Sequence, residues 1–193
     1  MTASRTPREA SRAFTLAEML IVVSIISAIL LLSISNLRGT LQAQNLSAAA
    51  TLLQNELRMT SILAVKENRA IYLRFLTATP ADATSPYRGW QLVALDPVTG
   101  LPTDLSAPQK LPSGIIFVDH EDYSNILELE PSLGPGLFFG FTPSGDTTLP
   151  KNSTARWCLT LSEESKAAAK PGRLPRNYRA LVIDAYTGNV SVY

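Results

Sequence analysis

The sequence is poor in the residues that build metal centres and covalent cross-links. It has one cysteine, Cys158, and one histidine, His120, among its 193 residues. A single cysteine excludes an intramolecular disulfide, and one cysteine with one histidine cannot make a Cys/His zinc cluster. We therefore expect a chain that is held together by its hydrophobic core and that carries no cofactor and no metal.

The sequence also lacks a marked excess of charge of either sign. Its formal net charge is +1, and removal of residues 1–13, which carry three arginines and one glutamate, would change that charge to −1. A nearly neutral protein has no general attraction for nucleic acid. The length leaves room for one modest soluble domain beside a membrane helix.

Charge is almost absent from one long segment. Residues 14–34 contain a single ionisable side chain, Glu18, and a hydrocarbon layer is crossed by about 20 apolar residues. The arginines before the segment, Arg5, Arg8 and Arg12, form a basic flank of the kind that stays in the cytoplasm. We expect residues 14–34 to form a single-pass transmembrane helix, with the remainder of the chain across the membrane.

Glu18 requires a partner, because an unpaired carboxylate in lipid costs roughly 2.5 kcal/mol or more. The apolar run opens with Ala13-Phe14-Thr15-Leu16-Ala17-Glu18, which resembles the prepilin cleavage and methylation motif of type IV pilins and type II secretion pseudopilins. The resemblance implies that prepilin peptidase cuts between Ala13 and Phe14, that Phe14 becomes N-methylated, and that Glu18 pairs with a terminal amine during filament assembly. The family usually has glycine at the position of Ala13.

The same resemblance implies further boundaries and partners. Residues 1–13 would be a leader peptide, and the N-terminal helix would contact other pseudopilins or pilins in the inner membrane, burying Phe14, Leu16 and Leu20. An ordinary secretory signal peptide is the alternative interpretation. A carboxylate ahead of the apolar region is atypical of a signal peptide, and this run outlasts the roughly 7–15 apolar residues expected of one.

Residues 35–68 are expected to continue the helix as an amphipathic segment. Apolar or small residues recur there mostly at spacings of three and four, which is typical of one helix face: Leu46, Ala49, Ala50, Leu53, Leu57, Thr60 and Ala64. There is no proline between residues 14 and 79. We therefore predict one nearly continuous helix that is weakest at Gly39 and ends near Asn68 and Arg69.

Residues 69–193 are expected to form a soluble β-rich domain. Alternating or short apolar runs predict strands at residues 71–75, 90–95, 115–118, 137–141 and 156–161 and a hairpin over 178–193. The fold class is α+β, with an antiparallel sheet packed on the exposed half of the helix. Together with the turns at residues 142–146 and 187–188, this order resembles GspH/FimT-type minor pseudopilins, and also the prepilin-like cassette D proteins of verrucomicrobial genomes.

A basic segment supports a second candidate function. Residues 163–179 contain no acid after Glu164, and a local basic loop can contact phosphate or acidic partners. Its cations are Lys166, Lys170, Arg173, Arg176 and Arg179. The alternative to a minor pseudopilin is thus a FimT-like DNA-binding pilin for DNA uptake, although the hairpin after Gly188 lacks the arginines expected there. A solvated loop is the plainer interpretation, and nucleic acid is not an expected partner.

An enzymatic role has little support. The acids beside His120 in residues 119–123 could bind a cation or act as an acid/base pair. A solvated loop is the favoured interpretation, because no other ligand set or nucleophile is nearby in the sequence. Cys158 falls on the outward face of a strand and is expected to be inert. With no nucleophile motif or phosphate-binding glycine loop, we expect a non-enzymatic filament subunit of the inner membrane whose C-terminal domain lies in the periplasm or on an extracellular filament.

Overall fold

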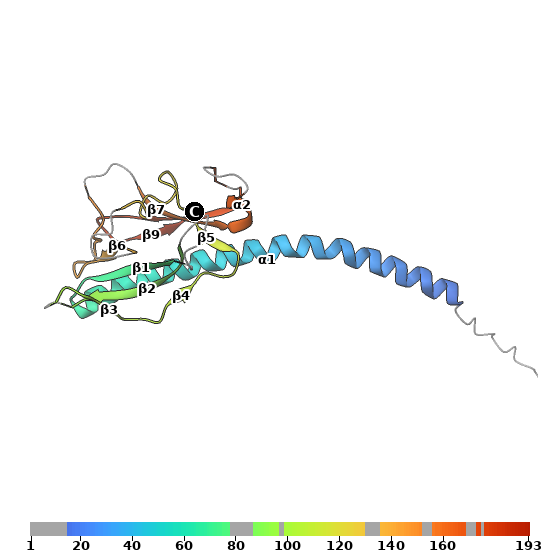
Figure 1. Ribbon diagram of the computed structural model, residues 1–193, viewed down its shortest axis with the longest axis horizontal. Coiled ribbons are helices and arrows are strands. Elements are labelled where there is room, and N and C mark those ends of the chain that lie inside the picture. Colours follow the sequence, from blue (N-terminus) through green and yellow to red (C-terminus); the bar gives the residue numbers. More distant parts are fainter. Residues whose placement is uncertain are drawn as a thin grey trace, which may run out of the picture. The chain divides into compact units, whose positions relative to one another are not determined.

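The computed structural model describes residues 15–77, 87–96, 99–129, 136–151, 156–168, 173, 174 and 176–193, without the side chains of 31–38, 137, 138, 167 and 168. The chain divides into two compact units, Met1–Leu41 and Gln42–Tyr193. Figure 1 shows the order of the elements along the chain. Domain boundaries at residues 13, 34 and 68 remain predictions.

The first element is one helix, α1 (Leu16–Glu67), which runs through Gly39 without interruption. It ends in a left-handed residue, Asn68, at φ 49°. The Asn68 N–H donates to the Val65 carbonyl at 3.3 Å, and the Arg69 N–H donates to the Ala64 carbonyl at 3.2 Å. These two bonds form a Schellman motif, which satisfies carbonyls that the helix itself leaves unpaired. The predicted continuous helix and its end point are confirmed.

Within the described part of the Met1–Leu41 unit, the side chains of the helix are exposed to solvent. Every residue from 15 to 30 is exposed in the isolated chain. Across the residues that the structure describes, no helix combines the length and the apolar character needed to cross a membrane.

In the Gln42–Tyr193 unit, α1 contributes one face to the core. All seven residues predicted for that face are at most 1% exposed. The six apolar ones share one cluster with strands from both sheets. The single polar member, Thr60, satisfies its hydroxyl by donating to the Glu56 carbonyl at 2.7 Å, as helix threonines commonly do. The prediction of this amphipathic face is confirmed.

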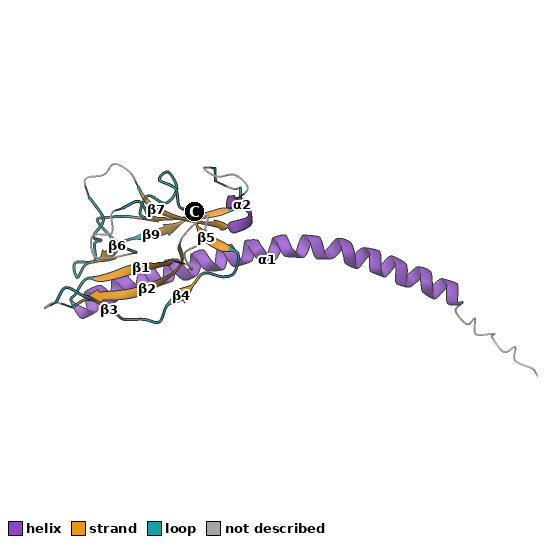
Figure 2. Ribbon diagram, viewed as in Figure 1, coloured by secondary structure: helices purple, strands orange, loops and turns teal. Residues whose placement is uncertain are grey.

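The strands form two antiparallel sheets, drawn in orange in Figure 2. The first contains β1 (Ile71–Thr77), β2 (Tyr87–Leu95), β3 (Pro102–Asp104), β4 (Gln109–Lys110) and β6 (Leu137–Phe141), in the order β3-β2-β1-β6 with β4 also on β2. The second contains β5 (Ile115–Phe117), β7 (Trp157–Glu163), β8 (Tyr178–Ile183) and β9 (Val190–Val192), in the order β5-β7-β8-β9. The predicted α+β class is confirmed, with two sheets.

Strand β2 is more buried than its sequence suggests. Residues 90–94 are all buried, whereas alternation along a strand of an antiparallel sheet commonly marks one buried and one solvated face. The second face is covered by the segment after β3: the Gln91 amide donates to the Ser106 carbonyl at 2.9 Å, and the Leu92 N–H donates to the Ser106 hydroxyl at 3.0 Å. A distant segment therefore buries a face that the local pattern leaves open.

The helix also reaches the free edge of the second sheet. The Gln54 amide donates to the Val190 carbonyl at 3.0 Å, and the Arg58 guanidinium donates to the same carbonyl at 3.4 Å. Because β9 is the last described strand in its sheet, these side chains satisfy a main-chain acceptor that no further strand of the described residues pairs.

Candidate functional site

The N-terminal motif begins a helix with a reciprocal cap. The Thr15 N–H and hydroxyl both donate to Glu18 Oε2, at 3.0 and 3.1 Å, while the Glu18 N–H donates to Thr15 Oγ1 at 3.2 Å. This is a capping box, the arrangement favoured by a Thr-x-x-Glu sequence. Thr15-Leu16-Ala17-Glu18 carries the sequence signal for this cap, which is separate from the assembly role expected of Glu18. In the isolated chain Glu18 therefore has a local structural role.

The other residues of the motif are either exposed or outside the described residues. Leu16 is 85% exposed and Leu20 is 63% exposed. Ala13 and Phe14, the predicted processing residues, lie outside the described residues. The next turns expose further large apolar side chains by 45–60%: Met19, Ile21, Val22, Val23, Ile25, Ile26, Ile29 and Leu30. A large apolar surface left without cover normally marks a contact with a membrane or another protein.

The predicted basic loop is in fact divided among several elements, so that prediction is partly wrong. Glu163 ends β7 and is 1% exposed. Its Oε1 accepts from Lys166 Nζ at 2.7 Å and from the Asn177 amide at 2.9 Å. Glu164–Ala168 form a short helix, α2. The buried Glu163 thus neutralises the positive charge of Lys166. A count of the acids after Glu164 could not reveal this pair.

The remaining described cations of this segment differ in their surroundings. Arg179 lies in β8. Its guanidinium donates to the Ser47 hydroxyl at 3.2 Å and to the Tyr178 carbonyl at 3.1 Å. Lys170 lies outside the described residues. Arg173 and Arg176 are exposed and form no ion pair with any residue that the structure describes.

The His120 segment forms a turn with few chemical possibilities. The Asp122 N–H donates to His120 Nδ1 at 3.3 Å, and the Asp122 carboxylate lies 3.8 Å from the same nitrogen. Burial raises the pKa of Asp119. No group of three potential metal ligands occurs among the described residues. The solvated-turn interpretation accounts for this geometry.

Cys158 lies on β7, half-buried, where the sequence pattern predicts it. Its backbone N–H donates to the Asn125 side-chain oxygen at 2.8 Å. Burial raises the pKa of the Cys158 thiol, and a hydrogen bond from the Asn125 backbone partly opposes this rise. A thiol with a raised pKa carries less of the reactive thiolate, which agrees with the inert role predicted for it.

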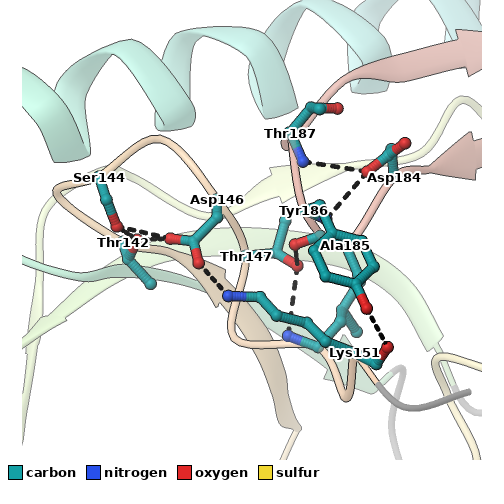
Figure 3. Close-up of polar contacts among 10 residues, drawn as sticks. Thr142, Ser144, Asp146, Thr147, Lys151, Asp184, Ala185, Tyr186 and Thr187 are labelled. Carbon is teal, nitrogen blue, oxygen red and sulfur yellow. Dashed lines mark hydrogen bonds and ion pairs between the residues drawn. The ribbon is translucent and has the colours of Figure 1, made fainter.

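The structure brings together the two turns that the sequence singled out. Figure 3 shows the polar contacts at this junction. The Thr147 hydroxyl donates to the Ala185 carbonyl at 3.0 Å, and the Tyr186 hydroxyl donates to the Lys151 carbonyl at 2.5 Å. The turn after β6 therefore packs on the turn between β8 and β9, which joins the two sheets.

Each turn is closed by an aspartate. Asp146 accepts from Lys151, from the Thr142 hydroxyl and from the Ser144 hydroxyl. These bonds, of which Lys151 makes the largest contribution, hold the pKa of Asp146 well below its usual value. In the other turn the Asp184 carboxylate accepts from the N–H groups of Thr187, at 3.0 Å, and Tyr186, at 2.9 Å, which lower its pKa.

A groove of about 380 Å³ lies beside this junction. Four stretches line it: residues 150–151, 156–157 and 182–186, with Asn189, Ser191 and Tyr193 from the final hairpin. Its volume is within the range of roughly 300–1,000 Å³ that ligand pockets occupy. The groove could not be predicted from the sequence, because the residues that line it come from separate segments.

The solved structures that are similar to the chain include two of the minor pseudopilin EpsH from the type II secretion system of Vibrio cholerae. The first is 12% identical, with a TM-score of 0.47, and the match covers 77% of this chain and 96% of that one. The second is 14% identical, with a TM-score of 0.45, covering 77% and 93%. No family model matches the sequence, and no curated protein does. At these identities the similarity is one of fold alone.

Proposed function

We propose that the chain is a minor pseudopilin, a structural subunit that prepilin peptidase processes and that assembles into a type II secretion pseudopilus or a type IV pilus-like filament. The observation that carries the proposal is the start of α1. One carboxylate in the first turn is followed by a helix whose described side chains, through residue 30, are exposed and mostly apolar. The proposed role is structural rather than enzymatic.

The chemistry of Glu18 explains why assembly suits this segment. Among the residues that the structure describes, its carboxylate accepts only from Thr15, and these bonds bring no positive charge to it. A charge at the boundary of an apolar helix is far less costly when a cation lies beside it. A terminal amine of another subunit, freed by cleavage before Phe14, would supply that cation.

The exposed apolar surface supports the same proposal. Leu16, Leu20 and the side chains of the following turns would be covered first by the lipid of the inner membrane and then by the helices of neighbouring subunits. The Gln42–Tyr193 unit, which has its own core, would lie in the periplasm or along the filament surface. DNA uptake is a weaker candidate, because the predicted basic loop is partly neutralised by Glu163.

Processing gives the first test. We expect the mature protein from cells that contain prepilin peptidase to begin at Phe14 and to carry one added methyl group, as measured by mass spectrometry of the intact chain. Cells without the peptidase should retain residues 1–13. A mature N-terminus beyond residue 34 would mean that the apolar segment is a removed signal peptide, and the proposal would be wrong.

Assembly gives the second test, with a pair of variants that separates charge from helix capping. Glutamine serves as well as glutamate in a capping box, so Glu18→Gln keeps the cap and removes the charge. Thr15→Ala removes the hydroxyl of the cap, at a cost of about 1 kcal/mol in helix stability, and keeps the charge. We expect Glu18→Gln to lower recovery in sheared filaments about tenfold or more, as the loss of a charged pair implies, and Thr15→Ala to lower it much less.

Membrane fractionation of both variants is the control, since each should still enter the membrane. Equal recovery of Glu18→Gln and the unchanged chain in filaments would contradict the role assigned to the Glu18 charge. An equal defect in both variants would show that assembly depends on the helix cap as strongly as on the Glu18 charge.

A further inference from the structure

The groove beside the turn junction is built on the outer face of the second sheet. Its lining includes Val182 and Ser191, which are paired directly across β8 and β9. Alternate residues of a strand point to the same face, so Asp184 after β8 and Asn189 and Tyr193 on either side of β9 belong to this face too. All five residues line the groove. The pairing of the strands therefore fixes the positions from which these side chains reach a ligand.

The lining extends along the strands. The Asp184 N–H donates to the Asn189 carbonyl at 3.0 Å, and the Tyr193 N–H donates to the Ala180 carbonyl at 2.9 Å. Asn189 and Tyr193 are four residues apart, which is roughly 14 Å at about 3.4 Å per residue. Tyr186, two residues after Asp184, lies toward the first end, so a tyrosine is present toward each end of the groove.

Both tyrosines offer accessible ring surface. Tyr186 is 65% exposed and Tyr193 is 67% exposed. The Tyr186 hydroxyl donates to the Lys151 carbonyl at 2.5 Å, a bond that Figure 3 shows close to Asp184. A ring that is fixed before binding loses little conformational entropy when a ligand arrives. Tyrosine also combines an apolar ring face with a polar tip, so it can pack against C–H groups of a ligand that is otherwise polar.

The side-chain charges of the described lining balance one another. Lys151 is paired with Asp146. Arg156 and Asp184 form no ion pair with any residue that the structure describes, and their charges are opposite. Asp184 opposes an anionic ligand, and Arg156 opposes a cationic one. The lining therefore favours a ligand without net charge, which excludes nucleic acid with its negative charge about every 1.7 Å of duplex.

The polar side chains of the lining can still form hydrogen bonds. Asp184 accepts both N–H groups of its own turn on Oδ1, and its Oδ2 has no partner among the described residues. The side chains of Asn189 and Ser191 likewise form no hydrogen bond with a described residue. An amide and a hydroxyl each donate and accept, whereas a carboxylate only accepts. An apolar ligand would bury these groups unpaired, which is costly.

A neutral sugar chain matches these features together. Its hydroxyl groups both donate and accept, its rings present C–H groups to aromatic faces, and several linked rings can follow an extended groove. An extended peptide would instead bind by pairing its main chain with a strand edge. On the β9 edge the Val190 carbonyl is already bound by Gln54 and Arg58.

We propose that this groove binds a neutral oligosaccharide, with one sugar ring on Tyr186, another on Tyr193, and the hydroxyl groups between them bonded to Asp184, Asn189 and Ser191. The site lies in the Gln42–Tyr193 unit and goes beyond the proposed function, because it depends on neither processing nor filament assembly. It gives this unit a carbohydrate-binding activity that is separate from the helix.

The first test is a set of tetrasaccharides immobilised on an array and probed with the full chain. The chain is held in a polyoxyethylene detergent, because alkyl glycoside detergents would themselves present sugar. Neutral probes are tetramers of glucose, galactose, mannose and N-acetylglucosamine. Charged probes are the tetramers of glucosamine and of galacturonic acid. We expect at least one neutral tetramer to bind more strongly than both charged ones, and more strongly than its own monosaccharide, which reaches only one tyrosine.

Variants then place the binding in the groove, with the affinity of the best neutral tetramer measured by isothermal titration calorimetry. Tyr193→Ala should weaken binding about fivefold, as expected for the loss of an aromatic contact, whereas Tyr193→Phe keeps the ring and should retain most of the affinity. Asn189→Ala should weaken binding about fivefold through lost hydrogen bonds. Tyr178→Ala removes a tyrosine that is 37% exposed outside the groove and should leave the affinity unchanged.

Salt dependence gives an independent readout, because binding of an uncharged ligand should change little as salt screens the groove's charges. The proposal would be overturned by no binding to any neutral tetramer, by stronger binding to a charged one, or by an equal loss with Tyr178→Ala and Tyr193→Ala. A steep fall of affinity with salt would likewise assign the groove to a charged ligand. Absence of sugar binding together with normal filament recovery would leave the proposed function intact.

Discussion

At the scale of single residues, Gly188 is the position where the two turns leave no room. It has a φ of +65°, and a Cβ built on it would lie 2.5 Å from the Gly145 carbonyl oxygen. A side chain would thus meet both an unfavourable backbone conformation and the backbone of the facing turn. Sequence alone marks Gly188 as a turn residue, and only the structure gives the second reason for glycine there.

Gly100 offers a matched control for that position. Its φ is +67°, and a Cβ there would meet nothing within 4 Å. We expect Gly100→Ala to cost about 1–2 kcal/mol through the left-handed backbone alone, and Gly188→Ala to cost roughly 1–3 kcal/mol more through the clash. The measurement is urea unfolding followed by tryptophan fluorescence, since both tryptophans are buried in the Gln42–Tyr193 unit. Equal costs would mean that the two turns separate easily.

At the scale of elements, α1 carries two kinds of apolar residue in its C-terminal part. Leu57 is 0% exposed in the core, whereas Met59, two residues later, is 61% exposed. The sequence reveals the first kind because the core face recurs at helical spacing. Whether an apolar residue off that face is covered depends on contacts beyond the helix.

This difference can be measured with two truncations in one helix. Leu57→Ala should destabilise the Gln42–Tyr193 unit by about 2–5 kcal/mol, because it removes buried methyl groups and leaves a cavity. Met59→Ala should change stability by only about 0.5 kcal/mol, as is usual for exposed positions, and alanine has the higher helix propensity. The readout is the same fluorescence-monitored unfolding. A large loss in Met59→Ala would indicate that this side chain is covered in the full chain.

At the scale of the whole molecule, the sequence predicts elements better than it predicts their partners. The long helix, its buried face and the final hairpin all depend on short-range periodicity and turn residues, and each is observed. The division into two sheets is not predicted, because strands far apart in sequence pair: β1 pairs with β6, and β5 pairs with β7. Period-2 alternation indicates which way a side chain faces and not which strand lies beside it.

The same limit applies to the sites. Glu18 stands out in the sequence because it is a lone charge in an apolar run, and its local bond to Thr15 could have been predicted from the spacing of three. The groove could not, because Arg156, Trp157, Tyr186 and Tyr193 share no spacing and meet only when β7, β8 and β9 have paired. The neutralisation of Lys166 likewise depends on Glu163 being drawn into a strand.

The bonds from Gln54 and Arg58 to Val190 have a consequence for crowding. An uncovered edge strand of a β-sheet can pair with strands of other molecules, which leads to aggregation. Here side chains of α1 bind the Val190 carbonyl on the edge strand β9. That strand is only three residues long. We therefore expect this sheet edge to resist strand addition between copies when the protein is concentrated.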